Sequence, residues 1–158
     1  MSLNFPPDTR EFVELLNSYG VKYVLLGGYA VGFHGHPRFT KDADFFVEAS
    51  VENGERVVRA VNEFGFDSFE LKPEQVAEGV TITMGRAPWR IDVIAFADGI
   101  TFAEAWATHI EATIAGVKLN VISRELLIRN KLATGRGQDA VDANTLLKRP
   151  PVDEGGVP

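Results

Sequence analysis

Three aspartates in short apolar segments are the residues of this chain best suited to chemistry. Asp42 and Asp44 stand one residue apart at the mouth of a predicted strand, in the run Arg38-Phe39-Thr40-Lys41-Asp42-Ala43-Asp44-Phe45-Phe46-Val47. Because side chains alternate along a strand, both carboxylates point to one face, where they repel each other. A hard divalent cation removes that repulsion, and Mg²⁺ and Mn²⁺ prefer carboxylate oxygen. The pair therefore indicates a metal site of the kind that phosphoryl-transfer enzymes use.

The third aspartate, Asp92, lies in the middle of the apolar segment Trp89-Arg90-Ile91-Asp92-Val93-Ile94-Ala95-Phe96. An unpaired charge in such a strand is costly, so Asp92 needs a partner. Two partners remain open. One is Arg90, in an ordinary ion pair on the same face. The other is a metal shared with Asp42 and Asp44, if the two strands are neighbours.

Upstream, a short apolar segment over Val21–Leu26 runs directly into Gly27-Gly28-Tyr29-Ala30-Val31. The pattern predicts a buried strand, a glycine turn and the first turn of a helix. Such a helix start presents unpaired backbone N–H groups at the positive end of the helix dipole, which is a binding site for phosphate. The alternative is a tight turn that needs glycine only for its backbone dihedral angles.

With these motifs the sequence resembles the nucleotidyltransferase superfamily, in the minimal branch that includes the AbiEii-type toxins. The resemblance runs from Val21 to about Leu147, and its specific part is the block from Gly27 to Phe46. It implies that Asp42 and Asp44 bind Mg²⁺ bridging a nucleoside triphosphate, and that Asp92 binds the metal nearer the acceptor and helps activate its hydroxyl. It also implies that Gly27 and Gly28 hold the phosphates. For the toxin-like branch it adds Lys131, as a catalytic residue, and Asp139.

The chain departs from the superfamily pattern in two places. Many members have Gly-Ser where this chain has Gly28 at the second position, followed by the bulky Tyr29. Few residues follow the helix that carries Asp142, so we expect the additional acceptor-binding domain of many members to be either missing or supplied by a partner, such as another protein or a second copy of the chain.

Composition predicts one domain over residues 1–148, because 158 residues with 45% hydrophobic side chains can form a self-sufficient core. Residues 149–158 are predicted to be a flexible tail. The absence of cysteine excludes disulfides and thiolate metal sites. We expect a cytoplasmic protein without membrane contact, since neither a leader nor a membrane-length apolar segment is present.

The order of elements predicts an α+β fold, a mixed sheet flanked by helices with a C-terminal helical pair. Asp8 is expected to cap the first helix, which ends at Tyr19. The other expected helices are 27–34, 51–64, 102–107, 124–133 and 138–147. The expected strands are 21–26, 45–48, 66–71, 80–84, 90–96 and a hairpin of 110–114 with 117–121.

Several polar residues near these motifs have a functional and a structural interpretation. Arg38, Thr40 and Lys41 precede the acid pair, where they are expected to contact the nucleotide phosphates, although Arg38 can equally pair with a carboxylate of the fold. The helical end is locally basic, either as a solvated face or as a surface for RNA, through Arg124, Arg129, Lys131 and Arg136.

Together these features predict a Mg²⁺- or Mn²⁺-dependent enzyme that moves a nucleoside monophosphate from a triphosphate to an acceptor hydroxyl. The resemblance to the AbiEii-type branch adds the toxin of a toxin-antitoxin pair as one interpretation. The acceptor stays open between a small molecule, a protein and RNA. The alternative is a module that binds a nucleotide or a partner without turnover. A metal-dependent phosphoesterase ranks last, because no nucleophile or histidine cluster accompanies the acids.

Overall fold

The computed structural model describes residues 5–35, 40–66 and 70–148 of the chain. Its centre is a mixed sheet with the strand order β3-β4-β2-β1-β6-β5. β1 runs antiparallel to β2 and parallel to β6, while β2 runs parallel to β4. The strands are β1 (Tyr23–Leu26), β2 (Asp42–Val47), β3 (Ile82–Met84), β4 (Arg90–Ile94), β5 (Ile110–Ile114) and β6 (Val117–Val121).

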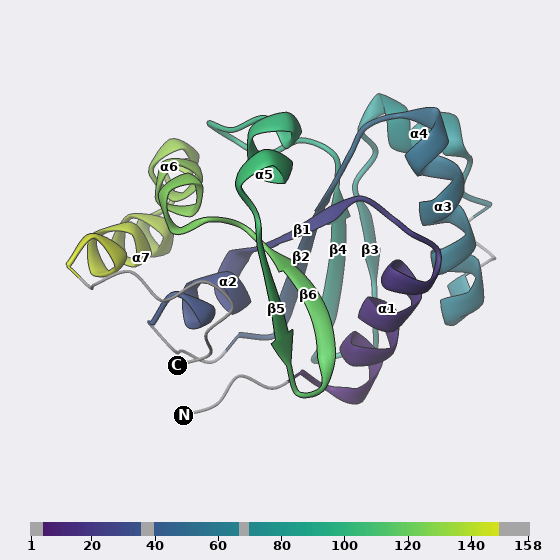
Figure 1. Cartoon of the computed structure of the whole chain (residues 1–158), viewed down its shortest axis with the longest axis horizontal. Helices are drawn as coiled ribbons and strands as arrows, with labels where there is room; N and C mark the ends of the chain where they lie inside the picture. The colour runs from purple at the N-terminus through teal and green to yellow at the C-terminus, as the bar shows by residue number, and fades with distance from the viewer. Residues whose placement is uncertain (1–4, 36–39, 67–69, 149–158) are drawn as a thin grey trace.

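Helices pack on both sides of this sheet. In Figure 1, α3 and α4 lie to the right of the strands, α1 lies at the lower right where it overlaps β3 in this view, and α6 and α7 lie to the left. Among the described residues, no helix combines the length and the apolar character needed to cross a bilayer. The helices are α1 (Pro7–Ser18), α2 (Gly27–Phe33), α3 (Val51–Val61), α4 (Pro73–Glu78), α5 (Phe102–Thr108), α6 (Arg124–Thr134) and α7 (Gly137–Leu147).

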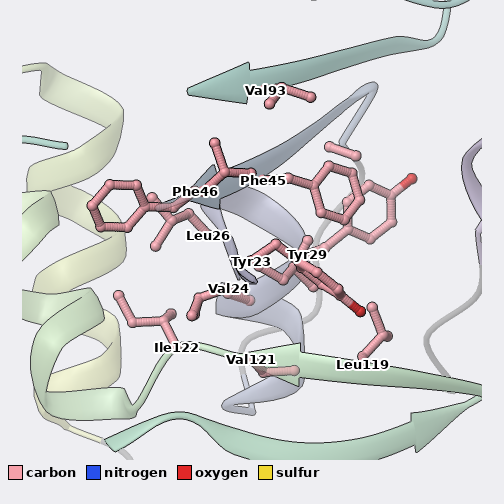
Figure 2. Packing of buried hydrophobic residues seen from close by; sticks show 14 of the residues in the cluster. Tyr23, Val24, Leu26, Tyr29, Phe45, Phe46, Val93, Leu119, Val121 and Ile122 are labelled. Carbon is pink, nitrogen blue, oxygen red and sulfur yellow. The ribbon is translucent and has the colours of Figure 1, made fainter. Parts of the chain in front are cut away.

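Adjacent aromatic residues on β2 divide the core into two layers. Figure 2 shows Phe45 and Phe46 on opposite sides of their strand, as strand alternation requires. Phe45 makes edge contacts with Phe12 of α1 and Tyr23 of β1, at ring distances of 5.7 and 5.8 Å. Phe46 meets Phe102 of α5 at 5.3 Å. A single mixed sheet with helices packed on both faces confirms the predicted fold class.

The C-terminal half matches the sequence prediction closely. β5 and β6 pair antiparallel over the predicted ranges, joined by Ala115 and Gly116, whose φ angles of 52° and 81° are those of a tight hairpin turn. The two closing helices are also present, as α6 and α7.

The predicted strand over residues 66–71 is wrong. A π-helical turn, Asn62–Phe66, follows α3, and Gly65 bends the chain there with φ of 107°. Residues 67–69 lie outside the described part. The chain then forms the unpredicted helix α4, which Pro73 starts and Gly79 ends in the left-handed conformation. The local structure therefore follows the helix-boundary residues Pro73 and Gly79, and the described apolar residues of the 66–71 segment do not form the predicted strand.

The prediction that Asp8 caps the first helix is also wrong. α1 begins at Pro7 with Pro6 at the capping position, and no side chain caps it. Asp8 lies in the first turn, where its charge still favours the positive end of the helix dipole.

β2 begins at Asp42, three residues earlier than predicted. Asp42 and Asp44 are therefore paired members of the sheet and not residues at its mouth. Because both residues are paired within the sheet, the strand register fixes the positions of their carboxylates.

Candidate active site

Strand pairing brings the three aspartates together. Asp44 lies opposite Asp92 across β2 and β4, and Asp42 lies opposite Arg90 two residues earlier. On the other side of β2, Asp44 lies opposite Leu26, the last residue of β1. Residues opposite each other on neighbouring strands point to the same face, so all three carboxylates share one face of the sheet.

The glycine turn after β1 lies directly against this face. Gly27 has φ of 68°, and a Cβ atom built on it would overlap the Asp44 carboxylate, lying 3.2 Å from its Cγ. A Cβ atom on Gly28 would lie 2.9 Å from the Cβ and Oγ1 of Thr40. The start of α2 thus approaches β2 more closely than any residue with a side chain allows.

Arg90 occupies the space among the carboxylates. Its Nη2 and Nε donate to Asp92 Oδ2 at 2.9 and 3.2 Å, and its Nε lies 3.8 Å from Asp42 Oδ1. Thr83 donates to the other oxygen of Asp92 at 2.8 Å. The structural partner that the sequence left open for Asp92 is therefore present.

Asp44 lies in a strongly acidic environment. Its burial, together with the negative charges of Asp92 and Asp42, raises its pKa from 3.8 to about 6. Within the described ranges, no cluster of three or more His, Cys, Asp or Glu side chains has the spacing of a metal centre. The donor chemistry nevertheless fits Mg²⁺ or Mn²⁺, because carboxylates from two adjacent strands share one face and the cation now between them is an arginine with a 55% exposed side chain.

Arg90 should therefore compete with a divalent cation for the carboxylates. Removing its positive charge in Arg90→Gln is expected to tighten Mg²⁺ binding by about threefold to tenfold, as measured by calorimetric titration. Arg86→Gln is the matched control, since Arg86 is also exposed and lines no cavity that contains the aspartates. Equal Mg²⁺ affinity in both variants would show that Arg90 and the metal do not share a site.

Lys131 of α6 is buried between two carboxylates of α7. Its Nζ lies 2.8 Å from Asp139 Oδ1 and 3.3 Å from Asp142 Oδ2. Arg136 and Thr134 also donate to Asp139, at 2.8 and 2.6 Å. Burial alone would raise the pKa of Asp139, but these hydrogen bonds and the charges of Lys131 and Arg136 outweigh it and lower that pKa. The cluster ties α6 to α7 beside the aspartates.

Replacing Lys131 with methionine should destabilise the fold strongly, because Asp142 would stay buried without the Lys131 charge and Asp139 would keep only its exposed cationic partner Arg136. We expect a loss of about 3–5 kcal/mol in the free energy of unfolding at pH 7, measured by denaturant titration. The control Arg129→Met breaks the exposed pair with Glu104 and should cost less than about 1 kcal/mol.

The same comparison has a predicted pH dependence. Since the pKa of Asp139 is lowered in the folded protein, its ion pair stabilises the fold above its ordinary pKa of 3.8, and this contribution is lost as the pH falls through the folded value. The stability difference between the parent and Lys131→Met should therefore shrink below about pH 4. A difference that stays constant through the acid range would contradict the buried ion pair.

Two adjoining cavities contain most of the predicted site residues. The carboxylate cavity, of about 310 Å³, is lined by the three aspartates, Gly27, Lys131 and Arg136, among others. The glycine cavity, of about 220 Å³, is lined by Gly27, Gly28, Thr40, Asp42, Asp44, Lys131, Arg136, Gln138 and Asp139.

One predicted phosphate contact is not placed there. Lys41 is exposed and lines neither cavity, and its carbonyl accepts from the Arg90 backbone N–H at 2.9 Å. Arg38 lies outside the described residues. A larger cavity, of about 690 Å³, lies at the opposite end of β1, near Lys22 and Trp106. None of the predicted site residues lines this cavity. The candidate site is therefore identified by the side chains that line it and not by its volume.

Sequence reasoning missed Arg136 as a site residue. Its side chain is 76% exposed, pairs with Asp139 and lines both cavities, so it offers a cation to an anionic ligand. The spacing of three residues between Arg136 and Asp139 was an available signal for this pair. Asn130 and Thr134 also line the carboxylate cavity, and no pattern in the sequence marked them.

Solved structures with a similar fold include nucleotidyltransferases. LnuA, a lincosamide antibiotic adenylyltransferase solved with lincomycin bound, has a TM-score of 0.55 at 14% identity, over 91% of this chain and 97% of that chain. ANT(2'')-Ia, solved with adenylyl-2''-tobramycin, has a TM-score of 0.56 at 16% identity, over 87% and 84%. A nucleotidyltransferase-like protein from Paracoccidioides brasiliensis has a TM-score of 0.53 at 16% identity, over 89% and 74%.

The protein therefore has a nucleotidyltransferase-like fold. No protein-family model matches the sequence, and no curated protein matches it.

Proposed function

We propose that the protein is a Mg²⁺-dependent nucleotidyltransferase, which moves a nucleoside monophosphate from a triphosphate to an acceptor hydroxyl and releases pyrophosphate. The observation that carries the proposal is the pairing of Asp44 with Asp92 across β2 and β4, directly beside the Gly27 turn. Carboxylates for a metal and a glycine turn for phosphate are the two parts that this reaction needs side by side.

Each part has a role in the proposed reaction. Asp42 and Asp44 would hold Mg²⁺, which would neutralise triphosphate charge when bound. The backbone N–H groups of Gly27 and Gly28 orient the phosphates. Asp92 orients the acceptor hydroxyl and takes its proton as the acceptor oxygen bonds to the α-phosphorus and the bond to pyrophosphate breaks. In this proposal Arg90 leaves Asp92 when the substrates bind.

The helical cluster supports the roles proposed for Lys131, Arg136 and Asp139. Lys131 is held in place by two carboxylates and lines both cavities, where its charge offsets that of the phosphates. Its pairing with Asp139 is consistent with the AbiEii-type branch that the sequence resembles, so a toxin role in a toxin-antitoxin pair is part of the proposal. Expression of the parent in a bacterial host should then arrest growth, and Asp44→Asn should not.

A non-catalytic nucleotide- or partner-binding module is the second candidate. It is favoured by Arg90, which already satisfies Asp92, and by the bulky Tyr29 that follows the two glycines. This module would bind triphosphates at the glycine turn without turnover.

Label transfer separates the two candidates. The protein is incubated with Mg²⁺, triphosphates labelled at the α-phosphate and a cell extract. The enzyme proposal predicts label on an acceptor, and predicts that Asp92→Asn stops the transfer while still binding nucleotide. Nucleotide binding without transfer in any extract would favour the module, and failure to bind all four common triphosphates would overturn both.

A further inference from the structure

The face that carries the aspartates continues as an apolar surface. Along β2, Asp42, Asp44 and Phe46 alternate onto one face, and Phe46 lies opposite Ile94 of β4. Beyond β4 the alternation extends to Phe96, since Asp92, Ile94 and Phe96 all line the carboxylate cavity. A molecule bound at Asp92 can therefore also contact the apolar side chains of Ile94 and Phe96.

A second cavity opens at this apolar end. The apolar cavity, of about 370 Å³, is lined by Phe46, Ile100, Phe102 and Ala103, among others. Phe96 and Ala97 line both this cavity and the carboxylate cavity, so the two share a wall.

Phe96 is the unusual residue in that wall. Its side chain is 68% exposed although it belongs to an apolar segment. A Cβ atom on Gly79 would overlap the ring, so Phe96 packs directly on the backbone at the end of α4. An exposed ring fixed between an acidic and an apolar cavity can contact a ligand that extends from one into the other.

The basic helical end is a small surface for RNA, since only Arg129 and Arg136 are exposed and both are already paired with carboxylates. Arg129 pairs with Glu104 at 2.6 Å, and Arg136 pairs with Asp139. Lys131 lies between Asp139 and Asp142, and Arg124 donates to the Leu146 carbonyl. Intramolecular partners thus engage all four cations, and the net charge of −6 adds repulsion for a polyanion.

We infer that the acceptor is a small-molecule alcohol with an apolar body, and that the apolar cavity binds this body while the hydroxyl lies at Asp92. The inference rests on the proposed function and names its acceptor class. The exposed Asp98, which also lines the carboxylate cavity, favours an uncharged or cationic molecule over an anionic one.

The test measures binding of 2-phenylethanol, an aromatic alcohol, by NMR titration of the full chain, without relying on turnover. We expect shifts of the Ile100, Phe102 and Ala103 amide signals. Ala103→Phe fills the cavity from an exposed position and should weaken binding about tenfold or more, equivalent to about 1.4 kcal/mol. Ala107→Phe, on the exposed side of the same helix and outside the cavity, should leave binding unchanged.

A second pair of variants tests the shared wall. Phe96→Ala should weaken 2-phenylethanol binding, whereas Leu147→Ala, which removes a similarly exposed apolar side chain at the end of α7, should not. Absence of binding to the parent, or equal binding to Ala103→Phe and Ala107→Phe, would overturn the inference.

The remaining measurements separate this inference from the proposed function. Triphosphate binding with Mg²⁺ is titrated in the same samples and should be the same in Ala103→Phe and the parent. If triphosphates bind and 2-phenylethanol does not, the acceptor class is wrong and the proposed function survives. If a short RNA binds in place of 2-phenylethanol and accepts label, RNA is the acceptor and the inference is overturned.

Discussion

Replacing Asp44 with asparagine is expected to lower the rate of nucleotidyl transfer by about a hundredfold to a thousandfold. The substitution keeps the size of the side chain and removes the charge that holds Mg²⁺. Burial, together with the charges of Asp92 and Asp42, raises the pKa of Asp44 from 3.8 to about 6, so its ionised form costs folding free energy that grows between these two pH values and is fully present above pH 6. The variant should therefore be at least as stable as the parent at pH 8, as measured by thermal unfolding.

Mg²⁺ makes this prediction specific. It should raise the melting temperature of the parent and leave that of Asp44→Asn unchanged, because a ligand stabilises only the folded form that binds it. Glu55→Gln, which removes an exposed carboxylate from α3, should respond to Mg²⁺ like the parent. Loss of folding in Asp44→Asn, or equal Mg²⁺ shifts in all three proteins, would identify the aspartates as structural.

Gly27→Ala is expected to be far more damaging than the same change at Gly20. The two glycines have nearly the same φ, 68° and 67°, so alanine is strained equally at both. A Cβ atom meets nothing within 4 Å at Gly20, whereas at Gly27 it overlaps the Asp44 carboxylate. Gly20→Ala should cost about 1–3 kcal/mol of stability and leave triphosphate binding intact. Gly27→Ala should cost more and abolish that binding.

A double variant tests whether Asp44 causes the difference. Combining Gly27→Ala with Asp44→Ala removes the overlapping carboxylate and should restore stability to about that of Gly20→Ala, without restoring Mg²⁺-triphosphate binding. Denaturant titration and calorimetry measure the two quantities. Equal stability losses for Gly20→Ala and Gly27→Ala would contradict the close approach of the turn to β2.

The parts of the fold with strong local signals were predictable from sequence. Ala115-Gly116 between two alternating segments predicted the hairpin, and two glycines after an apolar run predicted the start of α2. The aspartate spacing predicted a shared face. The register between β2 and β4 brings the three carboxylates into a single cluster. Register depends on long-range strand pairing, which no local sequence pattern specifies.

Long-range packing also explains what the sequence did not predict. The position of Arg90 between Asp42 and Asp92 depends on the pairing of β2 with β4. Phe96 was predicted as part of a strand, but β4 ends at Ile94. The Phe96 ring instead packs against Gly79 and stays largely exposed at the cavity wall. Side chains of this kind become interpretable only when the neighbouring elements are placed.

Anomalous diffraction would show directly whether the aspartates bind a metal and a nucleotide together. Crystals grown with Mn²⁺ and a non-hydrolysable triphosphate analogue would be measured at the manganese absorption edge. We expect an anomalous peak that marks a Mn²⁺ ion bound by Asp42 and Asp44. The triphosphate groups should lie at Gly27 and Gly28, and the Arg90 side chain should point away from Asp92. Arg90 still bridging Asp42 and Asp92, with no anomalous peak between the carboxylates, would show that the aspartates do not bind the metal.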